Sequence, residues 1–308
     1  MHGVGEPSIR FDHVIWVVPD LDAAARHLGG ELGLHVTEVG EHPGRGTRNR
    51  CIHFDLAYLE LIHVWNEELA AKTGTPFTAG VLDRHRRGGG LFTVALRVPD
   101  IERAATALGS AGFDVRLEEG SRRRADGSVV RWRTLDVAPP PAGAAPFFIQ
   151  WEMDERQRRA HLSDAGFLSE HRYGPAVLDS VDFVTDRPER LADYYRRLLS
   201  SAAPGGFQER HGRDDRLAAD FVAFDLPLGG IRILIPRGEP AGSPARREET
   251  GTAAPGLNNL PGGVKPFGEG PFMIRLRYGN GEGDPKIFHF PDLGAAWVAV
   301  SNALGTSG

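Results

Sequence analysis

The chain has 308 residues, 41% hydrophobic and 25% charged, which is enough to bury two cores of ordinary domain size. The formal net charge is -5 and charges of both signs are interspersed, so we expect a small-molecule partner rather than nucleic acid or a membrane surface. The single cysteine, Cys51, excludes an internal disulfide framework and a multi-cysteine zinc site. No signal-peptide pattern or membrane-length apolar run is present, which predicts a soluble, cytoplasmic protein, and the abundance of Ala, Arg and Gly is typical of bacteria with GC-rich genomes.

An internal repeat organises the chain from its first element onward. A strand that leads through Pro-Asp into a helix occurs twice, at Pro19-Asp20 and at Pro99-Asp100, and a weaker third copy follows. A repeated strand-then-helix unit decides the architecture, because each copy is one supersecondary module. The strand and helix ranges are 11–18 and 21–33, then 91–98 and 101–111, then 178–184 and 188–199.

Each of the three helices is followed by three strand-like runs, which gives the order β-α-β-β-β. Alternation along the first strand places His13, Ile15 and Val17 on one face and Val14 and Trp16 on the other, as expected of a sheet with a helix on one side and a cavity on the other. The predicted runs are 34–39, 47–56 and 57–65, then 114–117, 129–137 and 146–153, then 207–210, 218–226 and 230–236.

These elements predict an α+β protein of two tandem domains, the second one degenerate. The first, residues 9–155, pairs the modules 9–66 and 90–154; the second is 176–308. Between them, 156–175 is predicted to be a linker helix with an exposed basic face. The Gly- and Pro-rich segment 238–270 is predicted to be a long loop that covers a pocket, and a strand at 272–277 with a helix at 292–304 is predicted to be a shortened fourth module.

Three segments carry a resemblance to a known family: Asp12-His13-Val14-Ile15, the turn His42 to Asn49, and Tyr58-Leu59-Glu60-Leu61-Ile62. With the run Pro146 to Trp151, they resemble the glyoxalase-like domain family of the vicinal oxygen chelate superfamily, which includes glyoxalases, bleomycin-resistance proteins and extradiol dioxygenases. The resemblance covers roughly residues 9 to 175. It implies that two modules curl into one half-barrel around a divalent metal, which is held by the first and fourth strands of each module.

Within that resemblance, His13 and Glu60 are the metal ligands of the first module, and they suit Zn, Ni, Mn, Fe or Co. Alignment on the Pro-Asp pairs places Thr93 opposite His13 and Gln150 opposite Glu60 in the second module, and both are weak ligands. Glu152 and His53 could complete the site and are the candidate general bases. A simple hydrogen bond between His13 and Glu60 across the sheet is the alternative.

The glycine-containing turn before Asn49 could present backbone N–H groups and arginines to an anion, or could serve turn geometry alone. The third module has Ser180 and Arg232 at the positions of His13 and Glu60, so it predicts a copy without metal. The residues that we expect to contact substrate are Thr47, Asn49, Tyr58, Thr93, Arg97 and Phe148.

The leading functional hypothesis is a metal-assisted lyase or isomerase of the glyoxalase type, acting on a small oxygen-chelating substrate. A metal-free protein that sequesters an aromatic or antibiotic-like ligand is the alternative, because Trp16, Tyr58, Trp132, Phe148 and Trp151 supply aromatic surface. An extradiol dioxygenase comes third, since it would need a histidine at the position of Thr93. Modules can pair within one chain or between two, so a homodimer is also considered.

Overall fold

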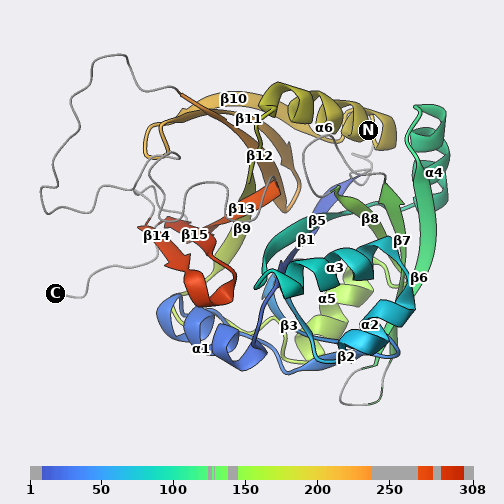
Figure 1. The fold of residues 1–308 in the computed structure, drawn as a ribbon, viewed down its shortest axis with the longest axis vertical. Helices are drawn as coiled ribbons and strands as arrows, with labels where there is room; N and C mark the ends of the chain where they lie inside the picture. Colours follow the sequence, from blue (N-terminus) through green and yellow to red (C-terminus); the bar gives the residue numbers. More distant parts are fainter. Residues whose placement is uncertain are drawn as a thin grey trace, which may run out of the picture.

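The protein is described by a computed structural model that covers residues 9–123, 127, 129–137, 145–237, 270–279 and 286–301. Two β-sheets lie side by side, a closed eight-stranded barrel and an open seven-stranded sheet (Figure 1). The predicted α+β fold of paired β-α-β-β-β modules is confirmed. The barrel strands are β1 (Arg10–Val17), β4 (Ala57–Val64), β3 (Thr47–Phe54), β2 (Gly40–His42), β6 (Val115–Arg123), β7 (Val129–Val137), β8 (Phe147–Trp151) and β5 (Gly90–Arg97), in that order around the barrel.

The repeated Pro-Asp pair has a structural role at the exit of β1 and β5. Asp20 is the N-cap of α1 (Leu21–Glu31) and accepts hydrogen bonds from two backbone N–H groups; Asp100 is the N-cap of α4 (Ile101–Ser110) and accepts one, from the N–H of Arg103. An aspartate at the N-cap satisfies N–H groups that have no partner inside the helix. The remaining helices of this half are α2 (Glu67–Thr73), α3 (Pro76–Arg86) and α5 (Glu155–Asp164).

The two barrel modules repeat the same pairing. In the first, β1 runs parallel to β4 with Ile15 opposite Glu60; in the second, β5 runs parallel to β8 with Ala95 opposite Phe147. β1 and β5 are antiparallel neighbours, so the modules meet along these two strands and close the barrel. The predicted alternation is borne out: Ile15 and Val17 pack in the interior cluster and Val14 and Trp16 in the outer core.

The seven-stranded sheet follows the same plan with fewer elements. Its first module is complete, with strand β9, helix α6 and three further strands, whereas the described part of its second module consists of strands and a short 3₁₀ turn, η2. Strand β9 lies between parallel β12 and antiparallel β13, as β1 lies between β4 and β5. The elements are β9 (Ala176–Val184), α6 (Pro188–Ala202), β10 (Gln208–Asp214), β11 (Ala219–Leu226), β12 (Gly229–Pro236), β13 (Gly270–Tyr278), β14 (Lys286–Phe290), η2 (Pro291–Leu293) and β15 (Ala296–Ser301).

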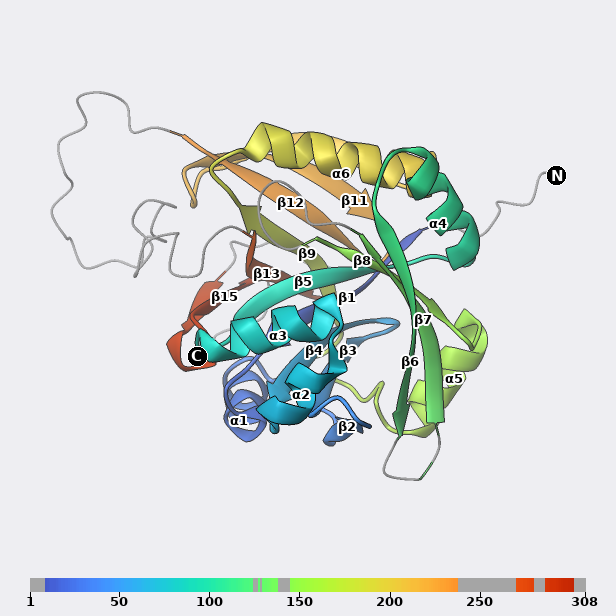
Figure 2. The ribbon, with the colours of Figure 1, turned by 45° about the vertical axis from the view of Figure 1, so that its right-hand side comes forward.

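The two halves share one hydrophobic core. Phe11 and Trp16 of β1 belong to the same buried cluster as Tyr195 of α6 and Phe224 of β11. The indole Nε1 of Trp16 also donates to the carbonyl oxygen of Leu293 at 2.7 Å. Figure 2 shows α6 lying across the open sheet and reaching α4 of the barrel half. The barrel is therefore closed on itself and is buttressed on its outside by the second half.

Two predicted elements need correction, and a third is not tested. The predicted strand at 34–39 is irregular; its Thr37 bonds Cys51 through the backbone and the hydroxyl, and β2 begins only at Gly40. The predicted helix at 292–304 is η2 followed by β15, which pairs with β13 and β14. The predicted loop at 238–270 lies almost wholly outside the described residues.

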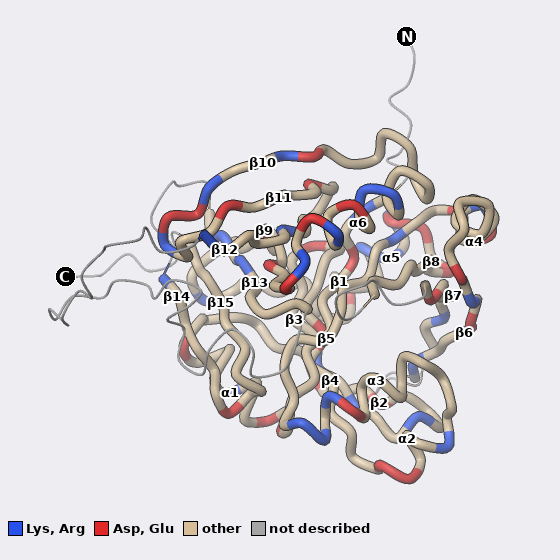
Figure 3. Tube along the Cα trace, turned by 45° about the horizontal axis from the view of Figure 1, so that its top comes forward, with Lys and Arg blue, Asp and Glu red and all other residues tan. Residues whose placement is uncertain are grey.

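Charges of both signs are interspersed along the described chain, with no stripe of one sign (Figure 3). A search of the described ranges finds no helix with the length and apolar character needed to cross a membrane.

Candidate functional site

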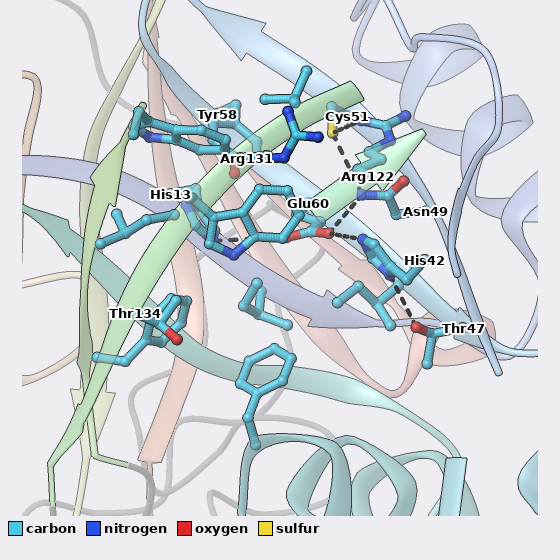
Figure 4. A pocket seen from close by; sticks show the side chains of 18 of the residues that line it. His13, His42, Thr47, Asn49, Cys51, Tyr58, Glu60, Arg122, Arg131 and Thr134 are labelled. Carbon is cyan, nitrogen blue, oxygen red and sulfur yellow. Dashed lines mark hydrogen bonds and ion pairs between the residues drawn. The ribbon is translucent and has the colours of Figure 1, made fainter. Parts of the chain in front are cut away.

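The candidate site is a cavity inside the barrel, lined by both modules and by α5. His13 comes from β1 and Glu60 from the neighbouring β4, and both side chains point into the cavity (Figure 4). His13 Nε2 lies 3.6 Å from Glu60 Oε2, so the two strongest candidate ligands are brought together as the sequence predicted. His53 lines the same cavity.

A β-bulge in β1 gives His13 a buried carboxylate partner. Phe11 and His13 face consecutive residues of β5, Leu96 and Ala95, so Asp12 is the extra residue in the strand. The bulge brings Asp12 Oδ1 to 2.7 Å from His13 Nδ1. A carboxylate on one ring nitrogen fixes the orientation of the imidazole and directs the other nitrogen, Nε2, at the cavity.

Asp12 is fully buried among positively charged groups. Its second carboxylate oxygen accepts from Trp151 Nε1 and from the Arg158 guanidinium, each at 3.1 Å, and Arg97 lies 3.6 Å away. Burial alone would raise the pKa of Asp12, but Arg158, the His13 hydrogen bond and Arg97 outweigh it and hold the pKa well below its usual range. The carboxylate is therefore ionised and keeps the Nδ1 proton of His13 in place.

Glu60 is held from the other side by β3 and β2. Asn49 Nδ2 donates to Glu60 Oε1 at 2.6 Å, and His42 Nε2 lies 3.6 Å from the same oxygen. The other nitrogen of His42, Nδ1, is 2.9 Å from Thr47 Oγ1. Glu60 thus stands between two imidazoles, with one strong hydrogen bond fixing its carboxylate.

The imidazole of His42 is uncharged at neutral pH. Burial lowers the pKa of His42 to about 4, and the nearby Arg122 and Arg45 lower it further against the opposing effect of Glu60. A neutral His42 adds no positive charge beside Glu60. The contact between His42 and Glu60 is therefore not an ion pair at neutral pH.

Aromatic rings form one wall beside His13. Tyr58 stacks on His13 with ring centroids 4.4 Å apart and on His53 with centroids 5.1 Å apart, and Phe167 stacks on the far side of His53. Burial raises the pKa of Tyr58 well above its usual value, so its hydroxyl stays protonated. These stacked rings border the polar groups of the cavity.

A second pair of acids lies in another part of the cavity lining, on β6 and β7. Glu118 and Asp136 both line the cavity, and burial together with the charge of Glu118 raises the pKa of Asp136 to about 6. Arg116 lies 3.2 Å from Glu118, which limits the build-up of negative charge there. This wall therefore takes up a proton under mildly acidic conditions.

The second module does not supply the residues predicted for it. Strand pairing places Phe147, rather than Gln150, at the position equivalent to Glu60. Gln150 is three residues further along β8 and turns to the opposite face, where its side chain bonds the backbone of Ile101 and Pro99 at the start of α4. Glu152 is 62% exposed and lies outside the cavity.

The predicted substrate contacts divide in the same way. Thr47, Asn49 and Tyr58 of the first module line the cavity. In the second module, Thr93 donates to the carbonyl oxygen of Ala145, Arg97 pairs with Glu155, and Phe148 packs in the core shared by the two halves. None of these three lines the cavity.

Three further site residues were not predicted from the sequence, namely Asp12, His42 and Arg158. His42 stands in the turn that carried the family resemblance, so its position beside Asn49 was the available signal. Arg158 belongs to the segment predicted to be a linker with an exposed basic face, but it is only 6% exposed and lies 4.4 Å from the Trp151 ring. Helix α5 is therefore part of the barrel wall.

The described residues do not complete a metal site of the predicted kind. His13 and Glu60 supply one half, but the Thr93 hydroxyl donates to the carbonyl oxygen of Ala145 and Phe147 has no ligand atom. Within the described ranges no group of three or more His, Cys, Asp or Glu side chains stands close enough to hold an ion. The donor set therefore fits two strong ligands rather than the three or four that a tightly held ion requires.

The second half carries a different arrangement at the equivalent positions. Ser180 and Arg232 take the places of His13 and Glu60, because Asp182 faces Arg232 as Ile15 faces Glu60. Arg232 and Arg275 each bridge Asp182 and Asp214, with nitrogen–oxygen distances between 2.7 and 3.3 Å. This four-residue cluster, the Arg/Asp network, fills the concave face of the second sheet with paired charges.

Comparisons with known proteins agree with this architecture. The model of the glyoxalase-like domain family matches residues 11–199. A curated relative, the ethylmalonyl-CoA/methylmalonyl-CoA epimerase of Cereibacter sphaeroides, is 33% identical over 106 residues, which are 34% of this chain and 73% of the relative.

Two solved structures share the fold over most of the chain. A hypothetical protein from Staphylococcus aureus superposes with a TM-score of 0.68 at 17% identity, over 95% of this chain and 99% of the other. A triple mutant of 4-hydroxymandelate synthase from Streptomyces coelicolor gives a TM-score of 0.54 at 13% identity, over 89% and 72%. With a family match that spans more than half of its length, the chain belongs to the glyoxalase-like domain family of the vicinal oxygen chelate superfamily.

Proposed function

We propose that the barrel is the active site of a glyoxalase-like isomerase or lyase that moves a proton at a carbon next to a carbonyl group. The observation that carries the proposal is the line Asp12–His13–Glu60, in which a buried carboxylate fixes a histidine whose Nε2 faces a second carboxylate in the cavity. Two neighbouring groups that exchange protons are what an enolisation needs. The similarity to an epimerase supports this class of reaction.

In the proposed reaction, Glu60 takes the proton from the carbon, and the electron pair of the C–H bond moves onto the carbonyl oxygen to give an enolate. Asn49 holds the Glu60 carboxylate in position through its 2.6 Å hydrogen bond. His13, kept in one orientation by Asp12, exchanges the proton with Glu60 through Nε2. Return of the proton to the same or the neighbouring carbon completes an isomerisation, and loss of a group from the enolate completes a lyase reaction.

Proton exchange in D₂O tests the proposal with the full chain. Glyoxal-type thiol adducts, 2-oxo acids and methylmalonyl thioesters would be incubated with protein and followed by NMR for replacement of C–H by C–D. Glu60→Gln and His13→Gln should slow the exchange by about 10²–10⁴-fold, the usual contribution of a positioned acid or base. Exchange that is unchanged in both variants would refute the assignment.

The same assay tests the metal-assisted mechanism predicted from the sequence. Because the described donor set supplies two strong ligands, we expect exchange to persist after dialysis against EDTA, and metal analysis to find no stoichiometric ion. Loss of exchange on dialysis, with recovery on adding Zn, Ni, Mn, Fe or Co, would show instead that an ion held by His13 and Glu60 takes part.

A binding protein without catalysis is the second candidate, and the stacked wall of Tyr58, His53 and Phe167 favours it. A flat aromatic ligand would bury its face against this wall. Saturable binding of aromatic compounds to wild type and to Glu60→Gln alike, with no C–H exchange in any substrate, would support sequestration over the proposed enzyme.

A further inference from the structure

Arg122 lines the cavity and, within the described ranges, forms no ion pair with a carboxylate. The guanidinium of Arg122, on β6, reaches into the barrel, where its NH1 group lies 3.9 Å from the sulfur of Cys51. Its Nε is buried without a hydrogen-bond partner, and among the described residues no carboxylate lies within ion-pair distance of it. Of the other arginines in the described lining, Arg158 and Arg131 are paired with Asp12 and Glu152, and Arg45 donates to the backbone carbonyl oxygen of Glu119 at 3.4 Å.

The backbone of β2 is shaped to accommodate this side chain. A Cβ atom on Gly40 would lie 1.9 Å from NH2 of Arg122 and 2.1 Å from its Nε, so the guanidinium would have to move out of its present position. A glycine at this place therefore leaves the slot in which the guanidinium lies. Figure 4 shows Arg122 beside Cys51, next to Asn49 and His42.

Arg122 is also close to the proposed reacting groups. A chain of contacts joins them: Arg122 touches Cys51, Asn49 Nδ2 lies 4.0 Å from the same sulfur, and Asn49 bonds Glu60. Arg122 further depresses the pKa of His42, which confirms that its charge is felt in the site. An unpaired cation in a largely apolar cavity is costly unless an anion joins it.

We propose that the cavity takes a carboxylic acid, whose carboxylate is anchored by Arg122 while its carbonyl-bearing end lies at Glu60. The planar guanidinium matches a carboxylate with two parallel hydrogen bonds. The attraction between Arg122 and the carboxylate of the acid also offsets the repulsion between that carboxylate and Glu60. This inference rests on the proposed function for the reacting end of the substrate, but the anion site itself stands on Arg122 alone.

The test compares acids with neutral analogues of the same shape. Pyruvate, 2-oxobutyrate and methylmalonate would be titrated by calorimetry against the full chain, alongside pyruvamide, 2-oxobutyramide and methylmalonamide. At least one acid should bind more tightly than its amide. Arg122→Gln should lower the affinity for that acid by about 30-fold and leave the affinity for the amide unchanged. Arg131→Gln, at the exposed rim, should cost about 3-fold or less.

A second variant distinguishes loss of the anion site from misfolding of Arg122→Gln. Gly40→Ala keeps the arginine but places a methyl group in the guanidinium slot, so it should reproduce the loss of acid binding without removing a charge. If no acid outcompetes its amide, or if both variants bind acid as wild type does, the inference is overturned.

The two proposals fail in different ways. Arg122-dependent binding of acids without C–H exchange would refute the proposed function and leave the anion site standing. Exchange that proceeds equally on acids and amides, and that Arg122→Gln does not alter, would refute the anion site and leave the proposed function standing.

Discussion

The concave faces of the two sheets start from the same strand plan and end in opposite states. In the barrel, His13 and Glu60 lie 3.6 Å apart in a cavity with an apolar wall. In the second sheet, Arg232, at the position of Glu60, belongs to the Arg/Asp network, where each arginine pairs with two carboxylates. The barrel face leaves polar groups open to a ligand. In the second sheet, each of the four charges of the Arg/Asp network is paired with an opposite charge.

The same strand plan can therefore carry either a ligand-binding cavity or a face whose charges are paired with one another. Buried charges that are fully paired contribute order but have nothing left to offer a ligand. A carboxylate that faces one neutral imidazole and one amide, as Glu60 does, forms no ion pair with either of them. The comparison can be tested by changing equivalent positions in the two halves.

The largest expected effect is on activity. Glu60→Gln should lower kcat by about 10²–10⁴-fold, because it removes the proposed proton acceptor and keeps the shape of the side chain. Ser180→Ala, at the position of His13 in the second half, should leave kcat and KM unchanged. Steady-state kinetics on a substrate found by the exchange assay would decide, and equal losses in both variants would mean that the site involves both halves.

The second expected effect is on stability and falls in the other half. Arg232→Ala leaves Asp182, which is fully buried, with one cation fewer, so the free energy of unfolding should drop by about 3–5 kcal/mol. Arg277→Ala, which removes the exposed pair with Asp179, should cost about 0–1 kcal/mol. Urea denaturation followed by fluorescence measures both free energies of unfolding. A similar loss of stability in the two variants would show that the Arg/Asp network stabilises the fold no more than an exposed ion pair does.

The smallest expected effect is a pH dependence that belongs to the barrel. The folded pKa of His42 is about 4, below its ordinary value of 6.5, so the unfolded chain binds the proton more readily. Stability is therefore complete above pH 6.5 and falls as the pH drops towards 4, by up to about 3 kcal/mol. His42→Gln should reduce this slope between pH 4 and 6.5 without abolishing it, because the pKa of His171 is also lowered to about 4 by burial and the pKa of Asp136 is raised to about 6. Thermal unfolding at pH 8 serves as the reference, and a slope identical to that of wild type would contradict the assignment to His42.

The sequence predicted the fold well because its signals are local. Each Pro-Asp pair ends a strand and caps a helix, and each alternating strand has one side for the core and one for the cavity. The predicted helix at 292–304 failed because pairing with β13 and β14 overrides the helix propensity of its alanines. Helices α2 and α3, between the two barrel modules, have no repeat to reveal them and were not predicted.

The candidate site was predicted only where it follows strand alternation. His13, Glu60, His53, Asn49, Thr47 and Tyr58 line one cavity, whereas their roles in chemistry stay predictions. Asp12 could not be foreseen, because a bulge turns it towards the His13 ring. Gln150 was aligned by spacing from the repeat, but β8 is in a register that puts Phe147 at that position and reverses the face of Gln150.

The common core has a practical consequence for anyone who isolates part of this protein. The family match ends at residue 199, inside α6, so a fragment cut there keeps β9 but loses its neighbours β12 and β13. Both edges of β9 would be unpaired, and Phe183 and Tyr195 would lose the cover of Phe224. Bare strand edges beside an uncovered aromatic surface favour aggregation. A fragment that ends before β9 would keep the barrel closed but would expose Phe11 and Trp16, so the full chain is the better choice for expression.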